Sequence, residues 1–506
     1  MKYCSEIRPL PLVWIALAVY CASFFAFYPS IFTVVDESAY VRQGAALANG
    51  SLTVAEIDPL TGTETHTRPS EYPIGTSLLM AIFIKPLGWK GAFLLPFISF
   101  VAVVLLLARW LLAEGRSPIY ALSLFLFPPA LVMGRVAMSD MPSTALVTAA
   151  LWLLWTGTGA RPIRWVTAGL IAGVSVMLRE TNPLIFAPFV LGAVLRGEKN
   201  RWYLSSAFAA GLSMRLVISA LLFGEMFFVK NSRASFSIAA IRANLLHFSL
   251  VFELLILGGL LFALAYHGNR RPEVLGSLIC FLAIYSCYEY SGEQSGALKG
   301  AILGGRFYLP IIPLSIYGTS ELFERMWVKF HTLRRNWSVR FGSGMRLLQW
   351  LIVLVACTNS ILVHATMKQW SSSQVRILNT IYTSTPNEGV IVTNTLATAK
   401  FINELYGTRH VLDATSVGTR ETETLLQRYG TFNLVILDRS DSDFWRDMSR
   451  VNQSLVSWIS KQTRLELVND VHLKSNEELR IWRVRSIVDA PQIVRASSRV
   501  GDTSSR

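Results

Sequence analysis

Two adjacent carboxylates, Asp36 and Glu37, follow directly after the first long apolar run of the chain. Holding an ionisable pair close to hydrocarbon costs free energy, so such a pair at the end of a membrane helix marks a candidate functional site. A carboxylate can act as a general base that takes a proton from an attacking hydroxyl group. The plain alternative is that the pair belongs to a solvated acidic loop.

Four later segments bring further charged residues to the same side of the expected membrane. An arginine alone at such a position is commonly an interfacial anchor. Charges of both signs at one depth, from well-separated helices, instead indicate a cavity that handles an anion. The four segments are residues 66–73, 134–142, 178–181 and 304–310.

The residue types in these segments suggest their chemistry. Arginine is suited to binding phosphate because its planar guanidinium matches the phosphate oxygens. Asp140 could position the substrate, hold Arg135, or share a divalent cation with Asp36, although the spacing of these acidic residues and His66 matches no metal motif. The candidate residues are Asp36, Glu37, His66, Tyr72, Arg135, Asp140, Arg179, Arg306 and Tyr308.

The composition is that of a membrane protein. Hydrophobic residues make up 52% of the 506 positions and charged residues only 16%, whereas soluble domains carry about 25% charged residues. The net charge of +14 is explained by Lys and Arg in cytoplasmic loops. It therefore does not point to a nucleic acid partner, and membrane lipids are the expected surroundings.

The apolar runs and the distribution of Lys and Arg together predict a topology. Runs of this length indicate transmembrane helices, and each expected inner segment contains Lys or Arg, as the positive-inside rule requires. We expect a multi-pass protein of the plasma or inner membrane, with residues 1–366 forming about eleven transmembrane helices and the N-terminus in the cytoplasm. The expected helices are 10–29, 91–112, 118–134, 142–157, 165–179, 183–195, 202–223, 246–266, 273–290, 306–323 and 347–366, with an amphipathic piece at 74–89 in the first outer loop.

The remainder of the chain has the pattern of a soluble α/β domain. Short β-branched runs alternate with amphipathic segments, so we expect an extracytoplasmic domain over residues 370–488 and a disordered tail over 489–506. Asp413, Asp438 and Asp441 fall near expected strand ends, where α/β sheets place ligand groups. Without a Gly-rich phosphate loop, we expect a docking or structural role there. The expected strands are 389–393, 432–437, 466–471 and 478–484, and the expected helices 398–406 and 443–460.

The order and placement of these motifs resemble the GT-C glycosyltransferases. The nearest branch contains the protein O-mannosyltransferases and the aminoarabinose lipid A transferases. The resemblance covers residues 10–320 and rests on four motifs: the Asp-Glu after the first helix, the Tyr-Pro segment, the Arg-x-Ala-Met-x-Asp-Met-Pro turn and the Arg-Phe-Tyr-Leu-Pro start of a late helix. It implies a polyprenyl-phosphate-linked sugar donor, a hexose or pentose as the transferred sugar, and a lipid, glycan or protein acceptor.

The resemblance also implies roles for the candidate residues. Asp36 matches the family's catalytic carboxylate and would be the general base, with Glu37 orienting a partner or aiding the acceptor. Asp140 resembles the family's second acidic residue. A single base and a leaving group that needs no acid suit a single displacement with inversion. We expect Arg135, Arg179 and Arg306 to stabilise the charge that develops on the leaving phosphate, and His66, Tyr72 and Tyr308 to contact substrate.

Two other functions account for part of the pattern. A transporter or flippase for a lipid-linked anion would explain the helices and the arginines, but not the acidic pair or the exported domain. A receptor or scaffold would make the outer domain the functional part. Convergence of Asp36, Asp140 and the three arginines on one cavity at the outer face would favour the enzyme.

Overall fold

The computed structural model describes residues 10–156, 161–224, 226, 237–242, 244, 263–268, 270–288, 304–333, 338–395, 409–439, 443–474 and 477–486. The chain divides into two compact units. Unit 1 consists of Met1–Ala55 and His66–Val375, and unit 2 of Glu56–Thr65 and Arg376–Arg506.

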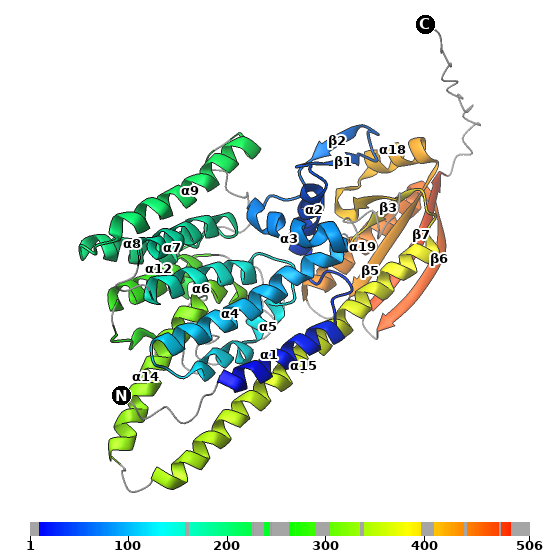
Figure 1. Ribbon diagram of the computed structural model, residues 1–506. Coiled ribbons are helices and arrows are strands. Elements are labelled where there is room, and N and C mark those ends of the chain that lie inside the picture. The colour runs from blue at the N-terminus through cyan, green and yellow to red at the C-terminus, as the bar shows by residue number, and fades with distance from the viewer. Residues whose placement is uncertain are drawn as a thin grey trace. The chain divides into compact units, whose positions relative to one another are not determined.

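Unit 1 is built from helices (Figure 1). Among the described residues, three helical stretches are long and apolar enough to cross a membrane: Trp89–Ala113, Arg201–Leu222 and Arg346–Ser384. Large apolar side chains remain exposed along two of them, with Leu221 79% and Leu347 72% accessible. Such surfaces are suited to contact with lipid chains, while the backbone groups are satisfied within each helix. The count of about eleven spans stays a prediction.

Most expected helices appear close to their predicted bounds. The helix expected at 118–134 is instead interrupted: it forms the 3-10 helix η2 (Pro118–Leu126) and the short helix α5 (Pro128–Met133). Pro128 and Pro129 lack N–H donors and disfavour helical geometry in the residue before them, so the helix cannot run through. The expected helix 246–266 lies almost entirely outside the described residues. The helices near their predicted positions are α1 (Leu10–Ala26), α3 (Ile74–Leu87), α4 (Leu94–Ala113), α6 (Asp140–Thr156), α7 (Pro162–Val174), α8 (Pro183–Leu195), α9 (Arg201–Phe223) and α12 (Arg271–Ser286). By contrast, α14 (Ile312–Leu333) and α15 (Ser338–Ser384) extend well beyond the helices expected at 306–323 and 347–366, and α15 runs past the expected end of the membrane domain at residue 366.

The segment after α1 contains a helix that the sequence pattern did not predict, α2 (Val35–Ala48). Asp36 and Glu37 lie in its first turn, where negative charge interacts favourably with the helix dipole. The Glu37 carboxylate also accepts a hydrogen bond from the Val34 N–H at 2.8 Å, which caps the helix start. The two candidate carboxylates are therefore fixed to a helix end. A two-stranded hairpin follows, β1 (Val54–Ile57) and β2 (Glu64–Thr67).

The helices α7 and α9 approach each other at glycines. A Cβ atom on Gly173 would lie 2.5 Å from the Phe208 carbonyl oxygen and 2.8 Å from the Gly211 Cα. Small residues permit such close contact between membrane helices. A short 3-10 helix, η3 (Ser175–Met177), follows α7 and leads directly to Arg179.

Unit 2 contains a five-stranded sheet in the order β4-β3-β5-β7-β6 (Figure 1). The strands β4, β3 and β5 are parallel, whereas β7 runs antiparallel to both β5 and β6. The four expected strands and the expected helix 443–460 are present, β4 and α18 were not predicted, and the expected helix 398–406 lies outside the described residues. The elements are β3 (Val390–Thr393), β4 (His410–Asp413), α18 (Thr419–Tyr429), β5 (Thr431–Arg439), α19 (Asp443–Gln462), β6 (Thr463–Lys474) and β7 (Glu477–Ser486).

The core of unit 2 includes a residue from the segment between α2 and α3. Leu60 packs against a cluster that contains Leu434 and Ile459, and Arg428 donates a hydrogen bond to the Leu60 carbonyl oxygen at 3.2 Å. The α/β unit is therefore not the single stretch 370–488 that the sequence predicts, because residues 56–65 belong to it. The expected tail 489–506 lies outside the described residues.

Candidate active site

Asp36 pairs with an arginine from a distant part of the chain. Arg306 opens the 3-10 helix η5 (Arg306–Ile311), and its Nη2 lies 3.5 Å from the Asp36 Oδ2. Tyr72 hydrogen bonds to the same aspartate, and its pKa is raised, first by burial and then by the charge of Asp36. The Asp36 side chain is still 29% accessible. It is thus positioned by its neighbours and open to a substrate.

Asp140 pairs with a second arginine. Arg179 Nη1 donates to Asp140 Oδ1 at 2.7 Å, and both side chains are almost buried. Arg179 Nε also donates to the hydroxyl of Tyr285 at 3.2 Å. This is a short charge-assisted bond supported by a second donor contact, so Arg179 is firmly held.

One aromatic ring joins the two pairs. The Cζ atoms of Arg179 and Arg306 lie 5.4 Å and 5.1 Å from the centroid of Phe307, within range of favourable cation–π interaction. The hydroxyl of Tyr40 lies within electrostatic reach of Asp36, Asp140 and Arg179. Two carboxylates and two guanidinium groups, carried by α2, α6, η5 and the turn after η3, therefore form one cluster, which we call the paired-charge cluster.

The turn between α5 and α6 positions this cluster. Residues 137–140 each contact a different residue of the site. In chain order, the groups that make these contacts are a backbone N–H, a thioether sulfur, a hydroxyl group and a carboxylate. The Arg-x-Ala-Met-x-Asp motif seen in the sequence is thus a structural junction. Its contacts are Ala137 N to Glu37 Oε1 at 2.7 Å, Arg306 Nη1 to Met138 Sδ at 3.4 Å, the Tyr40 hydroxyl to Ser139 Oγ at 3.2 Å, and Arg179 to Asp140.

Glu37 is fully buried and joins α2 to that turn. Its Oε2 accepts hydrogen bonds from the backbone N–H and hydroxyl of Thr33 and from the N–H of Val34, while its Oε1 accepts from Ala137. Burial raises the pKa of Glu37, although these four hydrogen bonds act in the opposite direction. Both oxygens are occupied, so the geometry favours a positioning role for Glu37 over contact with the acceptor.

Replacing Glu37 by Gln should lower both the stability of the protein and the rate of transfer. One carboxylate oxygen becomes an amide NH₂ group, which cannot accept the bonds that Glu37 now receives. A buried donor left unpaired costs about 1–3 kcal/mol, so the thermal midpoint should fall along with the transfer rate. The pH dependence of the remaining activity should keep its shape, because Asp36 is retained. Glu64→Gln, an exposed change in the same outer loop, is the control, and a Glu37→Gln protein of unchanged stability would contradict the positioning role.

Arg135 does not join the paired-charge cluster. Its electrostatic neighbours are Glu37, Tyr20, His364 and Lys368. Only 1% of the residue is accessible, and its three guanidinium nitrogens have no hydrogen-bond partner among the described residues. Burial lowers its pKa to about 10. The geometry therefore favours the other two arginines over Arg135 as ligands for a phosphate.

Arg135→Met should stabilise the protein in the absence of donor. Replacing a poorly compensated buried charge by an apolar side chain of similar volume can stabilise a protein by about 1–4 kcal/mol, so the thermal midpoint should rise. Donor affinity should change little. Arg109→Met, at an exposed position on α4, is the control. A fall in both stability and donor affinity would show that Arg135 has an anionic partner and reaches the donor.

The other three candidates differ in their placement. Tyr72 stacks on Tyr40, with ring centroids 4.6 Å apart, and belongs to the cluster through Asp36. Tyr308 is fully buried against the rings of Phe281 and Tyr285. His66 is exposed on β2 and takes part in none of the contacts described above.

Sequence reasoning missed several residues of the cluster. Phe307 stands next to Arg306 in the quoted motif, but only the structure shows that its ring contacts both arginines. Tyr285 lies inside an expected apolar helix, where an aromatic residue gives no signal of its own. Arg68 donates from Nη2 to the Tyr72 carbonyl oxygen at 3.3 Å, and burial together with the nearby Arg215 lowers its pKa to about 10.

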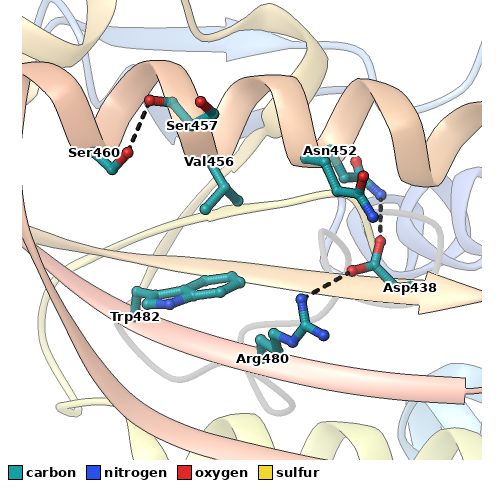
Figure 2. Close-up of a pocket in the computed structure, with 8 residues that line it drawn as sticks. Asp438, Asn452, Val456, Ser457, Ser460, Arg480 and Trp482 are labelled. Carbon is teal, nitrogen blue, oxygen red and sulfur yellow. Dashed lines mark hydrogen bonds and ion pairs between the residues drawn. The ribbon is translucent and has the colours of Figure 1, made fainter.

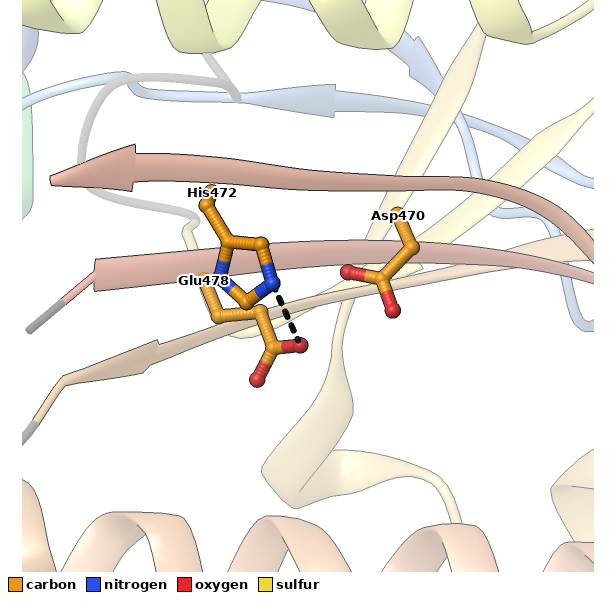
Figure 3. A group of neighbouring side chains, drawn as sticks. All are labelled: Asp470, His472 and Glu478. Carbon is orange, nitrogen blue, oxygen red and sulfur yellow. Dashed lines mark ion pairs between the residues drawn. The ribbon is translucent and has the colours of Figure 1, made fainter. Parts of the chain in front are cut away.

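A metal ion shared by Asp36 and Asp140 is one of the alternatives that the sequence leaves open. In the described part of the chain, three side chains that could together bind a metal ion lie in unit 2: Asp470, His472 and Glu478 (Figure 3). Their possible ligand atoms are within 4.8 Å of one another. Arg480 pairs with both acidic members of that group, so the group is already neutralised in part by a guanidinium. Asp36 and Asp140 are likewise paired with arginines.

Comparison with known proteins finds solved structures whose fold is similar to that of this chain. No protein-family model and no curated protein sequence matches the chain. The crystal structure of ArnT from Cupriavidus metallidurans in the apo state matches with a TM-score of 0.58 and 13% identity, covering 94% of this chain and 98% of that one. The structure of the same protein bound to undecaprenyl phosphate matches with a TM-score of 0.55 and 13% identity, covering 93% and 97%. The chain has the fold of ArnT.

ArnT is an aminoarabinose lipid A transferase with the GT-C fold. The GT-C fold that the motifs predict is thereby confirmed, and it is the fold of a polytopic membrane protein. The match to ArnT extends over nearly the whole chain. At 13% identity it concerns the fold, so the chemistry must be argued from the residues of the cluster.

Proposed function

We propose that the protein is an integral-membrane glycosyltransferase. It moves a hexose or pentose from a polyprenyl-phosphate-linked donor to a lipid, glycan or protein acceptor on the outer face. The observation that supports this best is the paired-charge cluster, in which the partly accessible carboxylate of Asp36 lies beside Arg306, and the ring of Phe307 links Arg306 to Arg179. The ArnT fold, and the ArnT structure bound to undecaprenyl phosphate, support a lipid-linked donor.

In the proposed reaction, Asp36 takes the proton of the acceptor hydroxyl. The hydroxyl oxygen forms a bond to the anomeric carbon while the bond from that carbon to the phosphate oxygen breaks. The electron pair of the broken bond passes to the polyprenyl phosphate, which leaves as a monoester with added negative charge. Arg306 and Arg179 stabilise that charge, and no acid is needed. A single displacement of this kind inverts the anomeric centre.

The two arginines contribute in different ways. Arg179 is held by Asp140 at 2.7 Å, whereas Arg306 lies 3.5 Å from Asp36, which is long for a charge-assisted hydrogen bond (about 2.7–2.9 Å). A donor phosphate can therefore draw Arg306 away from Asp36 at little cost. The same movement would release the Asp36 carboxylate for the acceptor hydroxyl. Donor binding would thus prepare the base.

Mass spectrometry of cell-surface glycans and lipids, with and without the gene, tests the proposal. Deletion should remove one sugar from one class of envelope component, and a gene encoding Asp36→Asn should not restore it. A transporter or flippase of a lipid-linked anion is the second candidate, because it would use the same arginines. For a transporter, Asp36→Asn should restore the missing sugar, and the purified protein should transfer none.

The proposal also requires a definite topology. The N-terminus and residues 325–346 should lie in the cytoplasm, and unit 2 should lie outside, on the side of the acceptor. Protease added to right-side-out vesicles should therefore cut residues 376–486, while residues 325–346 are cut only after the membrane is opened. Protection of residues 376–486 in sealed vesicles would contradict this arrangement.

A further inference from the structure

Unit 2 contains a pocket that the proposed reaction does not use. Its volume is about 310 Å³, and it lies between α19 and the strands β5 and β7 (Figure 2). This volume is at the lower end of the range for small-molecule sites, about 300–1,000 Å³. Its lining includes Asp438, Asn452, Gln453, Ser457, Arg480 and Trp482.

The pocket is at the place in the sheet where a ligand site is expected. Asp438 is near the end of β5, which runs parallel to β3, and α/β sheets place ligands at the carboxyl ends of their parallel strands. The sequence pattern singles out Asp438 for the same reason. In the structure, α19 and β7 lie beside the end of β5, and the three elements together form the pocket.

The polar groups of the pocket are held in place before any ligand arrives. The buried Asn452 donates from Nδ2 to Asp438 Oδ1 at 3.2 Å. Arg480 Nη1 lies 3.8 Å from the other oxygen of the same carboxylate. Figure 2 shows these groups at one end of the pocket and the indole of Trp482 at the other. A ligand would therefore meet a fixed polar end and a flat apolar end.

This combination fits a sugar ring. The faces of a sugar carry C–H groups that pack on an aromatic ring, and its hydroxyl groups need both donors and acceptors. Trp482 offers the flat apolar surface. Carboxylate, amide, hydroxyl and guanidinium groups together supply donors and acceptors at the other positions. A lipid chain would offer no partner to the donors and acceptors of these groups that remain free, and it would take them out of water, which is costly.

The surrounding charge selects among sugars. Three carboxylates, those of Asp438, Asp470 and Glu478, pair with the single guanidinium of Arg480. Among the described ion pairs at the pocket, carboxylates therefore outnumber guanidinium groups. A phosphorylated or acidic sugar would be repelled, whereas a neutral or amino sugar would be accepted.

We propose that this pocket of unit 2 binds a neutral or amino sugar residue of a saccharide, without chemical conversion. The proposal goes beyond the transfer reaction, because the pocket contains none of the residues of the paired-charge cluster. A protein with such a site can hold a glycan at a second point.

Titration calorimetry on the full chain in lipid nanodiscs tests the proposal. The probes are chitotriose, mannotriose and glucosamine, with glucose 1-phosphate as the anionic comparison. We expect at least one of the first three to bind, and to bind at least tenfold more tightly than glucose 1-phosphate. Absence of binding by all three, or a preference for the phosphate, would overturn the proposal.

Variants locate the site. Gln453→Ala changes an exposed side chain and Asp438→Asn keeps the shape of the residue, so both should fold, and each should weaken binding about tenfold. Gln462→Ala, also exposed on α19, is the matched control and should bind normally. Asp36→Asn should bind normally as well. Binding that is lost in Asp36→Asn but kept in Gln453→Ala and Asp438→Asn would belong to the transfer site and would also overturn the proposal.

Discussion

Replacing Asp36 by Asn should lower the rate of sugar transfer by about 10²–10⁴-fold, the usual effect of losing a general base. Asn keeps the size and shape of the side chain but cannot take a proton from the acceptor. Donor affinity should stay within a few-fold of normal or increase, because Arg306 loses its acidic partner. A transfer assay on the purified protein, together with a separate donor-binding measurement, checks both expectations.

The control for Asp36→Asn is Glu71→Gln, which removes an exposed carboxylate from the same outer loop and should leave transfer unchanged. If purified Asp36→Asn protein transfers sugar at a near-normal rate, Asp36 is not the base. Asp140 and Glu37 would be the next candidates, although both are buried.

The two arginines of the cluster should respond differently to removal. Arg306→Ala should weaken donor binding and kcat/KM by roughly 10–150-fold, which corresponds to about 1.5–3 kcal/mol for a hydrogen bond to a charged group. Its stability should change little, because Asp36 is 29% accessible and remains solvated. Arg179→Ala should weaken donor binding too, but it leaves the Asp140 carboxylate, only 4% accessible, without its cation. Breaking a buried pair in this way costs about 3–5 kcal/mol.

Thermal unfolding separates these two effects. Arg179→Ala should unfold at a clearly lower temperature than Arg306→Ala, and the double variant Arg179→Ala/Asp140→Ala should recover stability without recovering donor binding. Undecaprenyl phosphate is the binding probe for all three proteins. Equal stability of the two single variants would contradict the buried pair, and normal binding of the probe by both would remove the arginines from the donor site.

The membrane helices could be predicted because their signal is strong and local. A run of apolar residues long enough to cross a bilayer is rare in a soluble domain. The helix α2 carries no such run, and its start depends on a few hydrogen bonds around Glu37. The interruption at Pro128 is visible in the sequence as a proline pair, but the apolar run on both sides of it favours a continuous helix.

The sequence groups the candidate residues by expected membrane depth and side, which stay predictions, but it does not show which side chains meet. Sequence places Arg135, Arg179 and Arg306 near the same surface, but it does not show the direction in which each guanidinium turns. Two of them meet at Phe307, while Arg135 is buried near Glu37 and Tyr20. A motif alone also cannot show which of two adjacent aromatic residues, Phe307 or Tyr308, contacts a given arginine.

The membership of residues 56–65 in unit 2 has a consequence for biosynthesis. Leu60 leaves the ribosome several hundred residues before the strands of the sheet whose core it joins. At about 5–20 residues per second, that segment waits on the order of tens of seconds with its apolar side chain uncovered. The unit cannot close before the last strand, β7, has been made. If translation stops before residue 376, residues 56–65 never meet the rest of unit 2. Such a truncation would therefore leave exposed a segment that was translated correctly much earlier.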